Sequence, residues 1–198
     1  MMKIIGITGG IGSGKSEVLA YMNREYGVYV CEADKVARNL QQKGTACYQA
    51  IVESFGTEIL DQEGELDREK LAEKVFYSHE LLEQLNQLVH PAVKEDIREQ
   101  IKTEREKGTG IFVLEAALLL EDHYDEICDE VWFIYADREV RRRRLKSSRG
   151  YSDNKITAIF DSQMTRDEYL ERCDRAVDNS RSFEETCVQI NGFMKKIE

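Results

Sequence analysis

The 198-residue chain lacks the marks of membrane proteins and of proteins stabilised by a metal. No stretch reaches the roughly eighteen consecutive apolar residues of a transmembrane helix, and the N-terminus runs into a strand-like segment without the pattern of a signal peptide. The three histidines are scattered along the chain, whereas a tetrahedral metal site needs clustered Cys and His. We therefore expect no membrane span and no structural metal site.

Disulfide frameworks and basic surfaces are lacking as well. The five cysteines are odd in number and include no C-x-x-C pair, which is typical of reduced thiols in a cytoplasmic protein. The 38 Asp and Glu residues outnumber the 28 Lys and Arg residues, which gives a net charge of −10. Because such a surface repels nucleic acid and anionic lipid, we expect neither as a partner, and any bound anion needs a local site.

Short buried runs separated by helical patterns predict an α/β fold with a parallel five-stranded sheet flanked by helices. The predicted strands are 3–8, 28–34, 111–114, 130–136 and 176–180. The predicted helices are 16–26, 35–42, 45–55, 66–76, 79–108, 137–148, about 152–164, and one that starts at Ser182. The only proline, Pro91, favours the first turn of a helix, so we expect one helix to end near Val89 and another to begin at Pro91. The helices between the second and third strands predict an inserted helical lobe.

The segment GGIGSGKS at residues 9–16 predicts a phosphate-binding loop, because it follows a strand and opens a helix. Only small residues let a phosphate approach the backbone N–H groups closely, and the helix adds its positive end. We expect Lys15 to reach the β- and γ-phosphates of ATP and the Ser16 hydroxyl to ligate Mg²⁺. The nucleotide-binding candidates in this segment are Gly10, Ile11, Gly12, Ser13, Gly14, Lys15, Ser16 and Glu17. The alternative is a glycine-rich turn without a ligand.

Acidic residues follow the second and third strands, at the edge of the sheet where ligands bind. In extended chain Glu32 and Asp34 point to the same side, and Asp34 is our candidate base for a hydroxyl nucleophile. Alternatively, Asp34 caps the next helix. Glu115 is expected to orient the Mg²⁺ shell, or else to be a polar strand end that reaches solvent.

The segment DREVRRRRLKSSRGYS (137–152) is strongly basic. Four consecutive arginines cover all sides of a helix, so they cannot all face one ligand. One interpretation is a solvated helix with i,i+4 ion pairs. The other is a mobile lid whose arginines neutralise the transferring phosphoryl group. Arg144 and Arg149 are the catalytic candidates, because they straddle the end of the helix and the turn SSRG.

Taken together, these segments resemble the dephospho-CoA kinases, which use ATP to phosphorylate the ribose 3′-hydroxyl of dephospho-CoA in the last step of coenzyme A biosynthesis. GITGGIGSGKS, EADKVAR, the pair His90-Pro91, RLKSSRGYS, SQM and VDNS are similar to motifs of that family, in the same order. The resemblance implies a P-loop NTPase fold with a core at 1–34 and 109–198. It also implies a helical CoA-binding lobe at about 35–108, a lid at about 141–165, and small-molecule substrates only.

The resemblance assigns the family's catalytic aspartate to Asp34 and places Asn179, in VDNS, near the adenine. Arg38 is expected to bind a phosphate of the acceptor or donor, or to pair with a neighbouring acid. His90 either contacts the acceptor or is a residue at the start of a helix, held by the proline. Glu115 joins Asp34, Arg38 and His90 in the substrate-binding set. The sequence leaves the oligomeric state open.

Several positions depart from the family pattern. Glu32 replaces the first aspartate of D-A-D, Glu17 stands where a threonine is common, EAALLLE (115–121) replaces D-x-P-L-L-x-E, and NSRS lacks a glycine. Lys15, Ser16 and Asp34 are retained, so we expect an active enzyme. The alternatives are a nucleoside or nucleoside-monophosphate kinase and a nucleotide-binding switch without transfer. The absence of a guanine-specificity N-K-x-D motif disfavours the switch.

Overall fold

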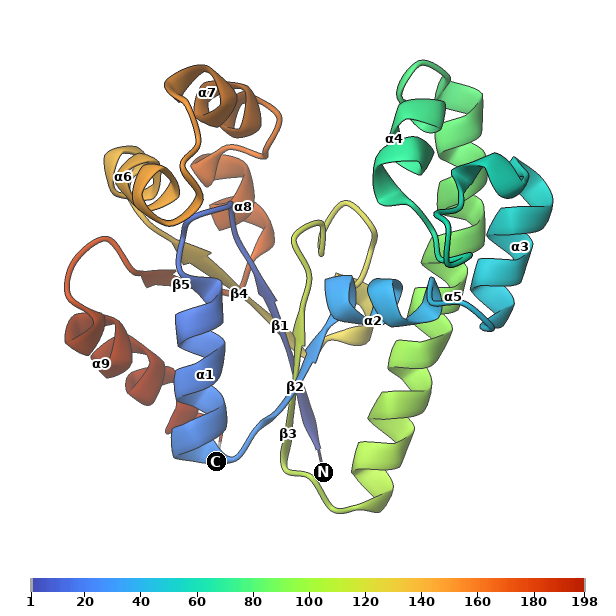
Figure 1. Cartoon of the computed structure of the whole chain (residues 1–198). Helices are drawn as coiled ribbons and strands as arrows, with labels where there is room; N and C mark the ends of the chain where they lie inside the picture. The colour runs from blue at the N-terminus through green and yellow to red at the C-terminus, as the bar shows by residue number, and fades with distance from the viewer. Residues whose placement is uncertain (1, 198) are drawn as a thin grey trace. The chain divides into compact units, whose positions relative to one another are not determined.

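A computed structural model describes residues 2–197 and shows a parallel sheet with helices around it (Figure 1). The strands are Lys3–Thr8 (β1), Tyr29–Glu32 (β2), Ile111–Glu115 (β3), Glu130–Tyr135 (β4) and Arg175–Asp178 (β5). They form one sheet in the order β2-β3-β1-β4-β5. Strand β1 pairs in parallel with β3 and β4, and β4 pairs in parallel with β5. The predicted α/β fold is confirmed, and β1 lies at the centre of the sheet.

The α-helices in the described residues are Lys15–Tyr26 (α1), Ala33–Leu40 (α2), Ala46–Phe55 (α3), Arg68–Phe76 (α4), His79–Glu106 (α5), Arg138–Arg149 (α6), Asp153–Asp161 (α7), Arg166–Arg172 (α8) and Phe183–Met194 (α9). Two 3₁₀ turns, Thr57–Ile59 (η1) and Asp125–Ile127 (η2), complete them. The chain divides into two compact units. The sheet unit comprises Met1–Cys31 and Glu104–Glu198, and the helical unit comprises Glu32–Thr103.

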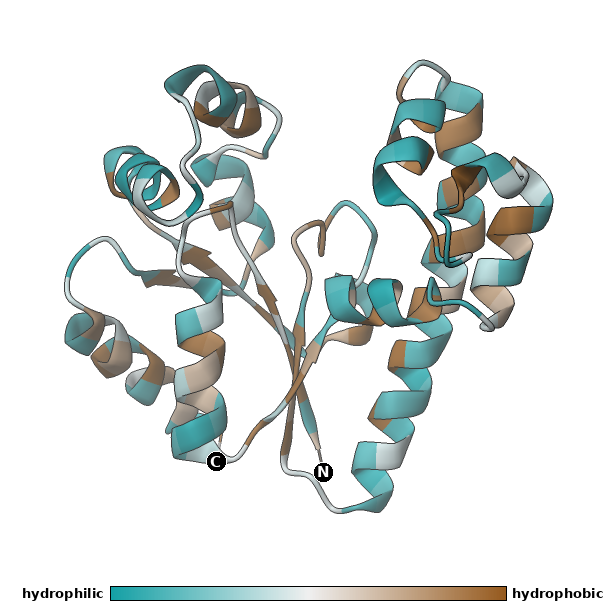
Figure 2. Cartoon of the chain, in the orientation of Figure 1, coloured by the Kyte–Doolittle hydropathy of each residue, from teal (hydrophilic) through white to brown (hydrophobic). Residues whose placement is uncertain are grey.

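The core of the sheet unit joins the sheet to α1 and α9. Ile5, Ile7, Trp132 and Ile134 are fully buried in it. They pack with Val18, Leu19 and Met22 of α1 and with Ile190 and Met194 of α9. Figure 2 shows the matching apolar stripes on these two helices, while α6 is mostly hydrophilic. This packing fixes the carboxyl end of β1, from which the glycine loop emerges.

Helix α5 is one continuous element, so the prediction that a helix ends near Val89 and a new one begins at Pro91 is wrong. Pro91 lies inside the helix and is exposed. Val89, Val93, Ile97 and Ile101 are buried at intervals of four residues. This apolar face keeps its helical register through the proline. Its burial therefore holds the helix together where one backbone hydrogen bond is missing.

Two other boundaries differ from the sequence prediction. The strand predicted over 28–34 ends at Glu32, because α2 begins at Ala33. The helix predicted to reach Met164 ends at Asp161. A separate helix, α8, follows it, with Thr165 and Glu168 forming a capping box. Thr165-x-x-Glu168 is itself a signal for a helix start, and the sequence analysis missed it.

We predict that Pro91→Ala stabilises the protein by about 1–3 kcal/mol, because alanine restores an amide that can donate to the Gln87 carbonyl and removes the steric conflict of the ring. Urea unfolding followed by circular dichroism measures the change. Pro91→Gly is the matched control: it restores the amide but should gain about 1 kcal/mol less, because glycine is a poor helix former. Equal or lower stability of Pro91→Ala would show that the proline is accommodated without cost.

Candidate active site

The glycine loop at residues 9–14 joins the central strand β1 to helix α1, whose N-cap is Gly14. Gly9, Gly12 and Gly14 have φ angles of 145°, 78° and 94°, which residues other than glycine rarely adopt. Space imposes a second constraint: a Cβ atom at Gly14 would collide with the amide of Asn179, and one at Gly9 with the Ile134 carbonyl. The loop therefore needs glycine at these positions both for its backbone conformation and for its close packing.

Side chains from outside the loop bind its carbonyl groups. Asn179, which follows β5 and is buried, donates from Nδ2 to the Ser13 carbonyl at 2.8 Å. Arg144 of α6 donates to the same carbonyl at 3.2 Å and to the Asn179 carbonyl at 2.9 Å. The Thr186 hydroxyl donates to Asn179 Oδ1 at 2.9 Å and so fixes the orientation of the amide. These contacts hold the backbone of the loop in one conformation.

Arg141 makes a second contact from α6 to the loop. Its Nε donates to the Ile11 carbonyl at 2.8 Å, its Nη2 donates to Gln163 Oε1 at 2.5 Å, and its guanidinium lies 4.3 Å from the centre of the Phe160 ring. Burial lowers the pKa of Arg141, although an arginine remains charged in proteins. Sequence reasoning chose Arg144 and missed Arg141. The signal was available, since residues three apart lie on one helix face.

The structure brings only one of the two arginines predicted as catalytic to the loop. Arg144 contacts it, as described above. Arg149 is the last residue of α6 rather than a residue of the following turn, and it is exposed. Its guanidinium lies 5.9 Å from the Tyr151 ring centre. Its predicted role as a lid arginine stays a prediction.

Lys15 and Glu115 lie together beside the loop. The Lys15 Nζ donates to the Gly9 carbonyl at 2.7 Å and lies 3.6 Å from Glu115 Oε1. Glu115 ends β3 and pairs in register with Ile7 of β1. It is buried, so the alternative of a strand end that reaches solvent is wrong. Ser16 is exposed in the first turn of α1, next to Lys15.

Asp34, Arg38 and His90 belong to the helical unit. Asp34 lies exposed in the first turn of α2 and forms no hydrogen bond or ion pair with another residue of the described chain. The N-cap of α2 is Glu32, so the alternative that Asp34 caps this helix is wrong. The expectation that Glu32 and Asp34 share one side of an extended strand is also wrong, because Asp34 is already helical. His90 lies inside α5, so it does not start a helix.

A cavity of about 340 Å³ opens beside the loop within the sheet unit. Gly10 and Ser13 of the loop form one wall, and the rings of Phe133, Tyr169 and Phe160 form others. Phe133 and Tyr169 stack at 4.4 Å, and burial raises the pKa of Tyr169 to about 12, so this tyrosine stays neutral. Arg138, Arg141 and Arg166 add positive charge. The cavity suits an anionic ligand that also carries a flat apolar group.

The glycine loop lies at the end of a central parallel strand and is followed by a lysine and a hydroxyl at a helix N-terminus. Arginines of α6 bind its carbonyl groups. This arrangement defines a P-loop phosphotransferase. The comparisons with known proteins specify the kind. The family model described as dephospho-CoA kinase matches residues 3–185. The chain belongs to the dephospho-CoA kinase family.

Relatives of known sequence and structure agree over nearly the whole chain. A dephospho-CoA kinase of Bacillus anthracis is 38% identical over 196 residues, which covers 99% of this chain and 98% of the relative. A crystal structure from Thermus thermophilus is similar with a TM-score of 0.84 at 28% identity and covers 99% of this chain and 98% of its own. Dephospho-CoA kinase from Campylobacter jejuni has a TM-score of 0.73 at 27% identity, with the same coverage.

We predict that Asn179→Ala lowers the free energy of unfolding by about 1–3 kcal/mol, because the buried Thr186 hydroxyl and Ser13 carbonyl each lose a hydrogen bond. Affinity for ATP should fall about tenfold as the loop loses its fixed conformation. Urea unfolding and calorimetric titration with ATP measure the two effects. The matched control is Asn154→Ala, at an exposed position of α7, and it should change neither. Unaltered ATP binding in Asn179→Ala would show that the loop holds its conformation without this amide.

Proposed function

We propose that this chain transfers the γ-phosphoryl group of ATP to the ribose 3′-hydroxyl of dephospho-CoA, giving CoA and ADP. The observation that carries the proposal is a fully formed phosphate loop in a chain that belongs to the dephospho-CoA kinase family over residues 3–185. No helix in the described residues is long and apolar enough to span a membrane. Five free cysteines support a cytoplasmic location for the reaction.

The proposed donor site is the loop with its flanking helix. Backbone N–H groups of residues 10–17 bind the phosphates, and the N-terminal end of α1 adds positive potential. Lys15 leaves its contact with the Gly9 carbonyl to reach the β- and γ-phosphates. The buried Ser13 hydroxyl, which has no hydrogen-bond partner among the described residues, is a further polar group at this place. Asn179 holds the loop on the side that we propose for the adenine.

The residues beside Lys15 fit Mg²⁺. Mg²⁺ prefers oxygen ligands and keeps several waters, so it needs only one or two protein groups in addition to the phosphates. Ser16 supplies a hydroxyl, and Glu115 supplies a carboxylate that can orient the water shell. The chemistry that Mg²⁺ supplies when bound is neutralisation of charge on the β- and γ-phosphates. In our proposal Glu115 also directs Lys15 toward the loop.

We propose Asp34 as the general base. Its carboxylate accepts the proton of the 3′-hydroxyl as the oxygen attacks the γ-phosphorus, and the bond from that phosphorus to the β–γ bridging oxygen breaks in line. Asp34 suits this role because it is exposed and has no partner among residues 2–197 that would hold its carboxylate elsewhere. Arg144, and Arg149 from a predicted lid, are proposed to stabilise the moving charge. Arg38 and His90 are proposed to bind the acceptor.

Incubation of the chain with ATP, Mg²⁺ and a panel of acceptors tests the function directly. We expect CoA and ADP from dephospho-CoA, with kcat/KM at least about a hundredfold above that for nucleosides and nucleoside monophosphates. Chromatography of the products and a coupled ADP assay measure both quantities. Preference for a nucleoside would replace the proposed acceptor, and ATP binding without transfer to any acceptor would reject the kinase.

We predict that Asp34→Asn lowers kcat about a hundredfold or more, because the amide retains the shape of the side chain but does not accept the proton as a carboxylate does. The Kd for ATP should stay within about twofold, since Asp34 is not part of the donor site. Steady-state kinetics and calorimetric titration with ATP separate these effects. Asp61→Asn, at an exposed turn of the helical unit, serves as the control and should leave kcat unchanged. An unaltered kcat in Asp34→Asn would remove Asp34 as the base.

A further inference from the structure

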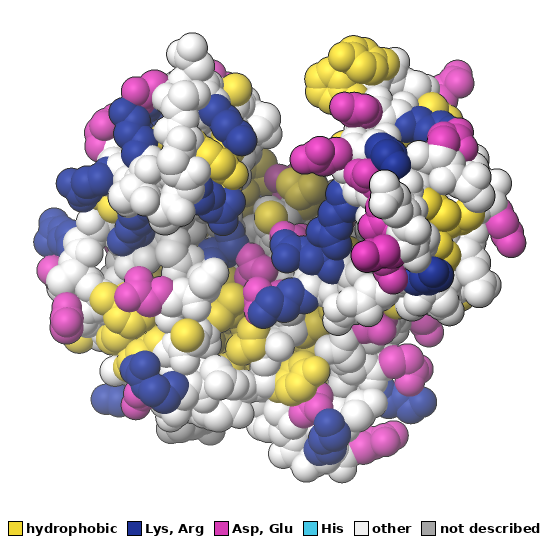
Figure 3. Space-filling view, viewed as in Figure 1, with side chains coloured by type: hydrophobic (Ala, Val, Ile, Leu, Met, Phe, Trp, Pro, Cys, Tyr) yellow, Lys and Arg dark blue, Asp and Glu magenta, His cyan; other side chains and the backbone are white. Residues whose placement is uncertain are grey.

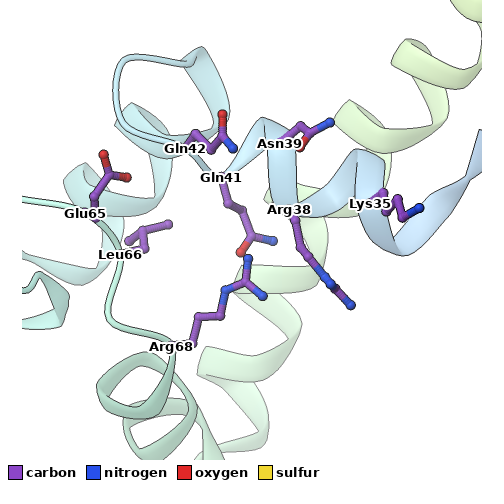
Figure 4. A pocket seen from close by; sticks show the side chains of 8 residues that line it. All are labelled: Lys35, Arg38, Asn39, Gln41, Gln42, Glu65, Leu66 and Arg68. Atoms are coloured by element: carbon purple, nitrogen blue, oxygen red, sulfur yellow. The ribbon is translucent and has the colours of Figure 1, made fainter.

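The helical unit contains a polar cavity of about 400 Å³ that lies apart in the chain from the phosphate loop (Figure 4). It is lined by Lys35, Arg38, Asn39, Gln41, Gln42, Glu65, Leu66 and Arg68. These residues come from α2, from the turn after it, from the segment just before α4, and from the first residue of α4. With three cations and one carboxylate, the lining has a formal charge of +2. That is unusual in a chain whose net charge is −10.

Two of the cations are unpaired. Lys35 forms an ion pair with Glu32 at 2.6 Å. Among the three arginines of the helical unit, Arg98 pairs with Glu95, whereas Arg38 and Arg68 form no hydrogen bond or ion pair with another described residue. Figure 4 shows both guanidinium groups directed into the same space, together with the amide of Gln41. In Figure 3, Lys and Arg side chains gather over α2.

The position of Arg68 in its helix indicates that its positive charge does not stabilise the helix. Arg68 is the first residue of α4, directly after the N-cap Asp67, whose carboxylate accepts from the amides of Glu69 and Lys70. A positive charge in the first turn of a helix opposes the helix dipole. Glu65, the only acid of the lining, accepts a hydrogen bond from the Lys43 amide at 3.1 Å. The two guanidinium groups are therefore available for an anion.

We infer that this cavity binds the diphosphate group of the acceptor, with Arg68 as a specificity-determining residue; the inference rests on the proposed function. A diphosphate diester carries two negative charges, which match the charges of Arg38 and Arg68, and guanidinium forks bind phosphate oxygens in bidentate geometry. The amides of Asn39, Gln41 and Gln42 can donate to the remaining oxygens. Leu66 is the one apolar residue of the lining, so the cavity does not suit an adenine ring or an apolar arm.

Helix α2 connects this subsite to the proposed base. Asp34 and Arg38 are four residues apart in α2, so they lie on the same face, roughly 6 Å apart along the helix axis. In the proposed acceptor, one ribose ring and its 5′-carbon separate the reacting 3′-hydroxyl from the diphosphate. An acceptor whose diphosphate is bound by Arg38 and Arg68 therefore presents its hydroxyl close to Asp34. The subsite would thus select acceptors that carry a diphosphate on the 5′ side.

The test compares Arg68→Gln and Glu65→Gln with a matched control, Arg98→Gln, in the full chain. We predict that Arg68→Gln raises the KM for dephospho-CoA about tenfold or more, with kcat and the KM for ATP within twofold. Glu65→Gln removes the negative charge of the lining and should lower the KM for dephospho-CoA, an effect that a folding defect does not produce. Arg98→Gln should leave all three constants unchanged. An unaltered KM for dephospho-CoA in Arg68→Gln overturns the inference.

A binding measurement keeps this result separate from the proposed function. Inorganic pyrophosphate is titrated calorimetrically into the chain saturated with a non-hydrolysable ATP analogue, so that the phosphate loop is occupied. We expect one pyrophosphate site in the wild type, weakened about tenfold in Arg68→Gln and unchanged in Arg98→Gln. This result without turnover of dephospho-CoA would leave the anion site in place and reject the proposed acceptor. Binding that is absent from the wild type, or insensitive to Arg68, would reject the site.

Discussion

The site depends on how the carbonyl oxygen of Ser13 is held. Asn179, which follows the edge strand β5, and Arg144 of α6 both donate hydrogen bonds to this oxygen. A peptide carbonyl that is bonded on the outer side of a loop directs the neighbouring N–H groups to the inner side, where a phosphate binds. Thr186 of α9 fixes the amide of Asn179, so the C-terminal helix also determines the shape of the loop. The order of strands, with β1 between β3 and β4, brings these elements together.

The same contacts make α6 part of the support of the loop. Arg141 and Arg144 bind loop carbonyls, and Ile11 of the loop packs against Leu145, Ile156 and Phe160. If the predicted lid moved together with the first part of α6, the hydrogen bonds of Arg141 and Arg144 to the loop would break. A lid that opens without breaking the hydrogen bonds of Arg141 and Arg144 to the loop therefore has to bend after Leu145, and its opening would separate Ile156 and Phe160 from Ile11. Arg149 lies beyond this point, exposed at the end of α6.

Sequence reasoning predicted the features that depend on neighbouring residues, and it missed the contacts and boundaries that depend on residues far away in the chain. Glycines, a lysine and a hydroxyl in a row identify the loop, because each residue type has a local physical reason to be there. Arg141 bonds Ile11 across 130 residues of sequence, and Gln163 in turn accepts from Arg141. Helical spacing places Arg141 on the same face as Arg144, but an uninterrupted run of arginines does not show which face turns inward. The proline in α5 misled for a related reason: its local preference is weaker than the burial of Val89, Val93 and Ile97 on both sides of it. Likewise, α2 begins at Ala33 because Ala33 and Val36 are buried on one helix face, which the apolar pattern of the preceding strand concealed.

An acidic chain that handles two polyanionic substrates needs two different ways to hold phosphate. At the loop, Lys15 is largely buried and paired with Glu115, so much of the attraction for phosphate comes from backbone N–H groups and the helix end in addition to Lys15, and little of it is screened by salt. In the cavity of the helical unit, Arg38 and Arg68 are exposed and form no ion pair with another described residue, so binding there is more easily screened and faster to reverse. This difference suits the two proposed ligands. The transferring phosphoryl group needs a fixed, dry environment in which charge is stabilised in the transition state, whereas the rest of the acceptor has to be recognised and then released as product. Because the proposed base lies on the helix that begins the proposed acceptor subsite, rather than on the loop, recognition of the acceptor would be joined to the chemistry.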